Sequence, residues 1–128
     1  MKVLFDTNIC IDHLRGLNQA TEYLGRRQEM ERWISALTIM ELFAAPKLSA
    51  DQLEKLSRLL EGFNGIVDVD SDIAASAGEF LGKYRKPNGL NPIDALIAST
   101  ALNIDAVLVT RNKKHFDFIP GLVIECPY

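Results

Sequence analysis

Short, continuous apolar segments alternate with helix-like segments along this chain, and this alternation constrains the fold more than any other feature. Val3–Phe5 and the segment 105–110 (DAVLVT) lack the regular polar positions of a half-exposed strand. Such runs are typical of strands that are buried on both faces of a parallel sheet. With further strands expected at 33–36, 65–70 and 122–126, the alternation predicts an α/β fold with about five mainly parallel strands flanked by helices.

Helical periodicity and capping residues define the segments between the predicted strands. Ser49 and Gln52 have the spacing of a capping box, and Asn91 followed by Pro92 is a typical helix start. The segment 86–92 (KPNGLNP) is the strongest loop signal in the chain. We expect the first helix to begin at a cap within residues 6–8 and to end at residue 14. The later helices are expected at 19–27, 38–45, 49–63, 70–86 and 93–102.

Length and composition favour one soluble domain over residues 1–128. The net charge of −3 argues against binding nucleic acid through overall charge, although it allows a local basic patch. We expect Cys10 and Cys126 to be reduced rather than joined in a disulfide. The sequence shows no signal peptide and no apolar run of about 18 residues that could span a bilayer, so we expect a cytoplasmic protein.

Three acidic residues are predicted to lie at one edge of the sheet. Asp6 follows the first strand, Glu41 lies in the predicted first turn of the next helix, and Asp94 lies in the first turn of the helix that follows the 86–92 loop. Strand ends and helix starts line the edge at which open α/β sheets bind ligands. Each acid could instead cap a helix, since Thr38 and Glu41 also have capping-box spacing.

The surroundings of these acids favour a metal site. Glu41 lies within the apolar stretch 39–45, and Asp94 opens a helix that is apolar on nearly every side. Burying neighbouring carboxylates is costly unless a cation balances their charge, and oxygen ligands suit Mg²⁺ or Mn²⁺ rather than zinc. Thr110, Arg111 and Asn112 end the 105–110 strand at the same edge, where Asn112 could bind a metal or orient its water.

Four segments together resemble PIN-domain proteins, and most nearly the VapC-type toxins of bacterial toxin–antitoxin pairs. The resemblance covers almost the whole chain and implies a three-layer PIN-like fold and an endoribonuclease that depends on Mg²⁺ or Mn²⁺. It also implies an RNA substrate, a cognate antitoxin and a homodimer. In chain order, the segments are VLFDTNI, ISALTIMELFAA, NPIDALIASTAL and AVLVTRNKKHF.

The resemblance carries over to particular residues. Asp6, Glu41 and Asp94 match the metal-binding acids. Asn112 stands where many relatives have a fourth acid, which leaves open whether the site holds one ion or two. We expect the remaining polar residues of the motifs to support the first acid; these are Thr7, Asn8 and Thr110.

Basic and apolar side chains supply candidate contacts with RNA and with protein partners. His13 and His115 have no acid partner at ligand spacing, and we expect both at the surface. The candidates for RNA binding are Lys83, Arg85, Lys86, Arg111, Lys113 and Lys114. The resemblance implies that an interface takes some of Leu14, Leu17, Tyr23, Leu24, Leu53 and Leu60.

Four other interpretations compete with the nuclease. A haloacid-dehalogenase-type phosphotransferase would need a second Asp at the position of Asn8, and a receiver domain would need an acid at Thr7. A dinucleotide-binding fold would need a glycine-rich turn after the first strand. A non-catalytic PIN-like module that binds RNA or protein remains the main alternative, and cleavage with metal binding would distinguish the two.

Overall fold

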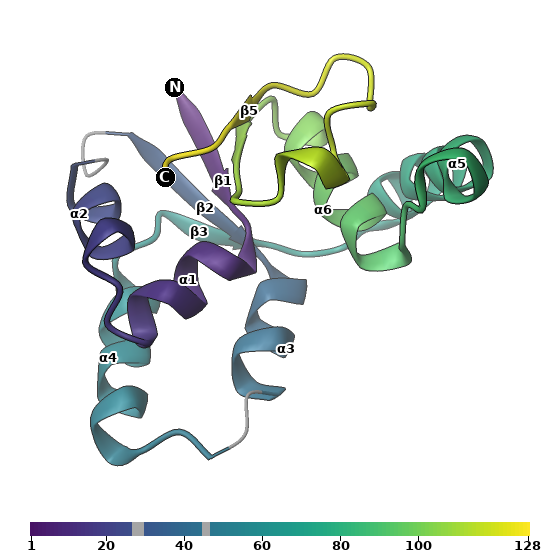
Figure 1. Ribbon diagram of the computed structural model, residues 1–128. Helices are drawn as coiled ribbons and strands as arrows, with labels where there is room; N and C mark the ends of the chain where they lie inside the picture. Colours follow the sequence, from purple (N-terminus) through teal and green to yellow (C-terminus); the bar gives the residue numbers. More distant parts are fainter. Residues whose placement is uncertain (27–29, 45–46) are drawn as a thin grey trace.

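Five parallel strands in the order β3-β2-β1-β4-β5 form the centre of the computed structural model, which describes residues 1–26, 30–44 and 47–128 (Figure 1). Each neighbouring pair is parallel, and this confirms the predicted α/β fold. The strands are β1 (Lys2–Phe5), β2 (Glu31–Ser35), β3 (Gly65–Val67), β4 (Val107–Val109) and β5 (Ile124–Glu125).

Helices cover both faces of the sheet and give it three layers. In Figure 1, α1, α2 and α4 lie on one side of the strands, and α5 and α6 lie on the other. The helices described are α1 (Thr7–Leu14), α2 (Asn18–Arg26), α3 (Ala36–Ala44), α4 (Ala50–Glu61), α5 (Ser71–Asn88) and α6 (Pro92–Asn103), with a short 3₁₀ turn, η1 (Lys113–His115). None of these helices is long and apolar enough to cross a membrane.

After Lys2, the central strand β1 is apolar because it faces two cores. Val3 and Phe5 pack into the core beneath α1, α2 and α4, whereas Leu4 packs into the core beneath α6. All three side chains are fully buried. Burial on both faces leaves no polar position between Val3 and Phe5, as the continuous apolar run predicts.

The strand register brings the ends of β1 and β4 together. Phe5 pairs with Val109, and the backbone N–H of Asp6 donates to the carbonyl of Val109 at 2.9 Å. On the other side of β4, the N–H of Thr110 donates to the carbonyl of Glu125 at 3.0 Å. Asp6 and Thr110 are therefore neighbours at the edge of the sheet where the strands end.

Helix α5 is longer than the sequence predicts, and the predicted 86–92 loop is correspondingly shorter. The helix continues through Pro87 to Asn88, and Gly89 ends it in the left-handed conformation with φ of 69°. The N–H of Gly89 donates to the carbonyl of Arg85, and that of Leu90 to the carbonyl of Tyr84. These two hydrogen bonds complete the last turn of the helix. The turn therefore does not depend on the backbone N–H that Pro87 lacks.

The predicted start of the helix after β2 is wrong by two residues. Helix α3 begins at Ala36, and the hydroxyl of Ser35 accepts a hydrogen bond from the N–H of Leu37 at 3.0 Å. Thr38 is therefore inside the helix and fully buried, so it forms no capping box with Glu41. Glu41 lies in the second turn, rather than the first. The predicted helix ends at residues 27 and 45 lie outside the described residues.

The structure divides the apolar interface candidates into two groups. Leu14, Tyr23 and Leu24 are buried in the first core, and Leu60 packs against it, because α1, α2 and α4 cover one another and the sheet. Only Leu17 and Leu53 of that set are exposed. The two cysteines are free thiols, as expected: Cys10 is buried and Cys126 is exposed.

Candidate metal centre

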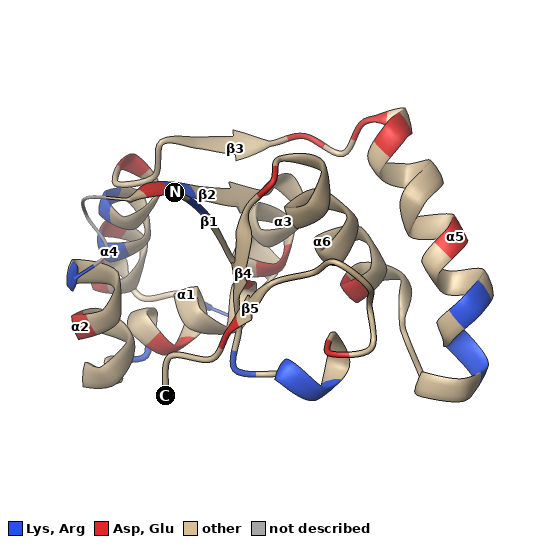
Figure 2. Cartoon of the chain, turned by 90° about the horizontal axis from the view of Figure 1, so that it is seen from above, with Lys and Arg blue, Asp and Glu red and all other residues tan. Residues whose placement is uncertain are grey.

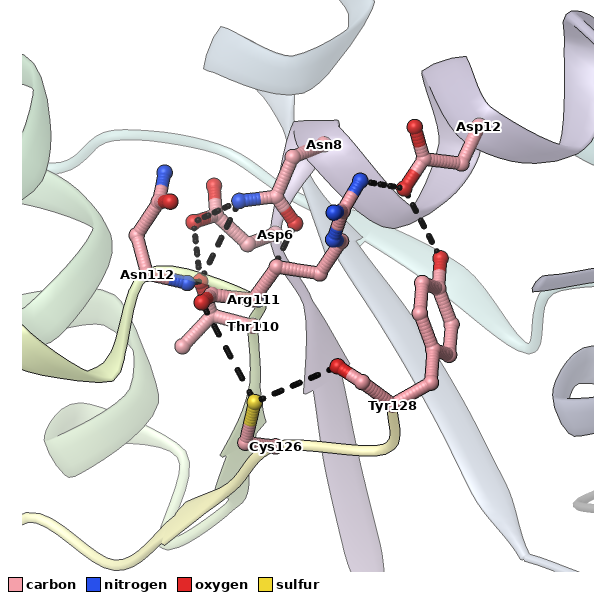
Figure 3. Close-up of polar contacts among 8 residues, drawn as sticks. All are labelled: Asp6, Asn8, Asp12, Thr110, Arg111, Asn112, Cys126 and Tyr128. Atoms are coloured by element: carbon pink, nitrogen blue, oxygen red, sulfur yellow. Dashed lines mark hydrogen bonds and ion pairs between the residues drawn. The ribbon is translucent and has the colours of Figure 1, made fainter. Parts of the chain in front are cut away.

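Asp6 is the most constrained acid at the edge of the sheet. It caps α1, since its Oδ1 accepts the N–H of Thr7 at 2.8 Å. Its Oδ2 accepts the hydroxyl of Thr110 at 2.8 Å and a longer bond of 3.4 Å from the carboxamide of Asn8 (Figure 3). Three donors from two strand ends therefore fix both carboxylate oxygens.

Thr110 connects this carboxylate to the segment that carries Asn112. Besides donating to Asp6, its hydroxyl accepts from the side chain of Asn8 at 3.3 Å and from the N–H of Asn112 at 3.0 Å. Thr110 is fully buried, so water does not compete for these bonds. The position of Asn112 is consequently linked to that of Asp6 through one hydroxyl.

Glu41 reaches the same pocket from α3 and is held by a threonine pair. The hydroxyl of Thr7 lies 2.7 Å from Oε1 of Glu41 and 3.0 Å from the hydroxyl of Thr38. A carboxylate only accepts hydrogen bonds and a hydroxyl has one proton. Thr7 therefore donates to Glu41 and can accept from Thr38. Since the backbone of Thr7 also donates to Asp6, this residue links the two acids.

Asp94 is oriented by two neighbours, one of which was not expected. Asn91 caps α6 by accepting the N–H of Asp94 at 2.8 Å, and its Nδ2 donates to Asp94 Oδ2 at 3.0 Å. Nδ1 of His115 lies 3.2 Å from the same oxygen. His115 is exposed, as expected, but the expectation that it has no acid partner is wrong. The contact spans 21 residues, so local spacing could not reveal it.

The acids line one pocket of about 170 Å³ at the carboxyl end of β1. Its lining includes Asp6, Glu41, Asp94 and Asn112. Within the described ranges, no three His, Cys, Asp or Glu side chains are close enough to form a complete metal cluster by themselves. Because Mg²⁺ usually keeps several waters and takes only one or two carboxylates, this open pocket, whose polar side chains offer oxygen ligands, still fits such an ion.

The electrostatics of the pocket also fit a cation. The pKa of Asp6 is raised from 3.8 to about 6. Burial is the largest cause and the negative charges of Asp94 and Glu41 add to it, whereas the hydrogen bonds from Thr110 and Thr7 oppose it. Asp94 and Glu41 therefore each repel the carboxylate of Asp6. A divalent cation between them would remove this repulsion and replace the lost hydration.

Basic side chains gather on two segments of the fold. Figure 2 shows Lys and Arg gathered in the last part of α5 and in the segment that follows β4. Lys83, Arg85 and Lys86 are exposed on α5, and Lys113 and Lys114 are exposed in η1. Arg111 differs from these five, because its guanidinium is paired with Asp12 at 2.8 Å.

A second pocket of about 150 Å³ adjoins the first at Asp94. Lys114 and His115 line it together with Asn88 and Asn91. Sequence reasoning missed two residues near the acids, Asp12 and Tyr128. Asp12 lies four residues after Asn8, so helical spacing could have placed it on the same face of α1.

The fold and site together define an α/β protein with an acidic pocket at the end of its central strands. The family model for the PIN domain matches residues 3–121. The chain belongs to the PIN domain family.

Known relatives and solved structures show which PIN-domain proteins this chain is similar to. The chain is 35% identical to the ribonuclease VapC19 of Mycobacterium tuberculosis, over 93% of this chain and 95% of that protein. It is 30% identical to the tRNA(fMet)-specific endonuclease VapC of Salmonella typhimurium, with coverage of 98% and 97%. A toxin–antitoxin complex from Klebsiella pneumoniae matches with a TM-score of 0.78, 33% identity and 98% coverage of both chains. VapBC2 from Rickettsia felis, solved with a promoter DNA fragment, has a TM-score of 0.81, 27% identity and the same coverage.

Proposed function

We propose that this chain, a PIN-domain ribonuclease of the VapC type, cleaves RNA with a divalent cation bound among Asp6, Glu41 and Asp94, directly or through its waters. One observation supports this proposal above all. The three carboxylates and the carboxamide of Asn112 line a single pocket, in which burial and mutual repulsion raise the pKa of Asp6 to about 6. PIN-domain nucleases of this type generally depend on divalent metals, and Mg²⁺ or Mn²⁺ suits these oxygen ligands.

Different residues orient each of the three acids. Thr110 and Asn8 orient Asp6, Thr7 orients Glu41, and Asn91 with His115 orients Asp94. A bound Mg²⁺ or Mn²⁺ would activate water and stabilise the charge that develops on the phosphate and the leaving oxygen. We assign Asn112 to the orientation of water, and its neutral side chain favours one tightly held ion over two. The products would carry a 5′-phosphate and a 3′-hydroxyl.

The exposed basic residues would hold the RNA. Lys83, Arg85 and Lys86 extend from α5, and Lys113 and Lys114 from η1, so the two groups could contact phosphates next to the cleaved bond. This arrangement would allow RNA binding despite the net charge of −3, because a local group of positive charges can hold phosphates on a protein that is acidic overall.

We assign two partner surfaces to the chain. An apolar groove of about 230 Å³ includes Ile11, Leu14, Leu42 and Leu48, and it would take an apolar segment of an antitoxin. Phe43 and its neighbour Met40 are largely exposed on α3 and would contribute to a homodimer interface. The relatives solved as toxin–antitoxin complexes support the antitoxin assignment. With these partners and an RNA substrate, the protein would act in the cytoplasm.

The proposal is tested by incubating purified protein with bulk RNA and mapping the product ends. We expect cleavage with Mg²⁺ or Mn²⁺, none with EDTA, and recovery when the metal is restored in excess. Cleavage that persists in EDTA would contradict the proposal. Metal-dependent stabilisation without any cleavage would favour the non-catalytic binding module.

A further inference from the structure

Arg111, Asp12 and Tyr128 form a compact cluster beside the acidic pocket, here called the Asp12 clamp (Figure 3). Oδ2 of Asp12 accepts a hydrogen bond from Nη1 of Arg111 at 2.8 Å and another from the hydroxyl of Tyr128 at 2.9 Å. The guanidinium of Arg111 also lies 5.4 Å from the centre of the Tyr128 ring, within cation–π range. Each of the three side chains therefore contacts the other two.

The clamp joins three segments that meet at the end of β4. Asp12 belongs to α1, Arg111 directly follows Thr110, and Tyr128 lies beyond β5. The backbone N–H of Arg111 points to Oδ1 of Asn8 at 3.4 Å. The side chain and the backbone of Arg111 are thus both tied to α1, while Asn112 is the next residue in the chain.

Burial and charge both favour the contacts of the Asp12 clamp. The side chain of Asp12 is only 14% exposed, whereas that of Arg111 is 46% exposed. Burial, and then the hydrogen bond to Asp12, raise the pKa of the Tyr128 hydroxyl above its ordinary value, so this group remains a donor. Lys113 and Lys114 form no ion pair within the described residues, so they differ from Arg111 in being available to phosphates.

We propose that Asp12 and Tyr128 are positioning residues that hold Asn112 at the acidic pocket by fixing Arg111. This inference rests on the proposed function, because the position of Asn112 affects catalysis only if the pocket is the active site. It also changes the role of Arg111, which becomes a structural link to α1 rather than a contact for RNA phosphate.

Steady-state kinetics separate these two roles of Arg111. If the clamp positions Asn112, Tyr128→Phe and Asp12→Asn should each lower kcat by about five- to tenfold and leave KM for RNA unchanged. This loss corresponds to the usual net contribution of one hydrogen bond. If Arg111 instead binds phosphate and Asp12 holds it back, the same changes lower KM and leave kcat unchanged. Glu54→Gln is the control, since it breaks an exposed ion pair of 2.9 Å with Arg58 on α4 and should change neither constant.

The side-chain amide NMR signal of Asn112 gives a readout that does not depend on cleavage. We expect Tyr128→Phe to shift or broaden this signal in the protein without RNA or added metal, and Glu54→Gln to leave it unchanged. A wild-type protein that cleaves no RNA would refute the proposed function, while the Asn112 signal would still report on the clamp. A Tyr128→Phe protein with wild-type kcat, KM and Asn112 signal would overturn the clamp. If Tyr128→Phe does not fold, Asp12→Asn carries the same test, because it removes the charge that pairs with Arg111 and preserves the side-chain volume.

Discussion

Thr110 donates a 2.8 Å hydrogen bond to Asp6 although 104 residues separate them in the chain. The contact exists because β1 and β4 are neighbours in the sheet and end at the same level. The position of the Asp6 carboxylate is therefore set by the pairing of β1 with β4, through the buried hydroxyl of Thr110.

Replacing Thr110 with valine tests the importance of this hydroxyl. The change preserves shape but removes the donor to Asp6 and the acceptor for Asn8 and Asn112. We expect kcat to fall about 10- to 100-fold and the free energy of unfolding to fall by about 1–3 kcal/mol, because buried polar groups lose their partner. RNA cleavage rates and urea unfolding measure the two effects.

Thr100→Val is the matched control for that experiment. Thr100 is also fully buried, but its hydroxyl donates to the carbonyl of Leu96 within α6 and touches none of the acids. It should lose some stability and keep its kcat. Equal losses of kcat in both variants would show that Thr110 acts through general stability alone.

The raised pKa of Asp6 predicts a pH dependence of stability in the metal-free protein. The folded state favours the protonated carboxyl of Asp6. The contribution of this residue to the free energy of unfolding is therefore greatest below pH 3.8 and is lost as the pH rises to about 6. A pKa raised from 3.8 to about 6 corresponds to about 3 kcal/mol at most. Asp6→Asn should remove this dependence and make the metal-free protein more stable at neutral pH, although it abolishes cleavage.

Thermal unfolding in EDTA across this pH range measures the effect. Asp70→Asn is the control, since Asp70 also caps a helix but is exposed, and Asn is an equally good cap. It should leave the pH profile unchanged. A metal-free Asp6→Asn protein that is less stable than wild type at neutral pH would contradict the argument that the pocket is electrostatically strained.

Charge reversal in η1 tests the RNA-binding surface. Lys113→Glu with Lys114→Glu should raise KM for RNA at least about tenfold and reduce the salt dependence of binding by about two counterions, without changing the fold. Steady-state cleavage rates measure KM, and fluorescence anisotropy at several salt concentrations measures the salt dependence of binding. Lys2→Glu is the control, because Lys2 starts β1 at the opposite edge of the sheet. An unchanged salt dependence in the double variant would remove η1 from the RNA surface.

The sequence predicted the strands and the common edge of the acids well, because both follow from local patterns. Continuous apolar runs give buried strands, and strand ends in a parallel sheet meet at one edge. The capping box at Ser49 and Gln52 is likewise present, since it depends only on neighbours within one turn.

Long-range contacts account for what the sequence did not predict. His115 contacts Asp94, and Tyr128 contacts Asp12, only because η1 and the segment after β5 fold back beside α6 and α1. The boundary of α3 was misplaced for a local reason, since Ser35 rather than Thr38 accepts the first free N–H. Arg111 resembled its basic neighbours in sequence, and only its buried partner Asp12 distinguishes it.

Mn²⁺ binding to wild type and to Asp94→Asn, measured by calorimetry alongside RNA cleavage, tests the central claim most directly. The account predicts saturable binding and metal-dependent cleavage in wild type, and an affinity weakened at least about tenfold with no cleavage in the variant. Asp117→Asn, an exposed acid after η1, should behave as wild type. An Asp94→Asn protein that melts as wild type does, binds Mn²⁺ equally and still cleaves RNA would contradict the account.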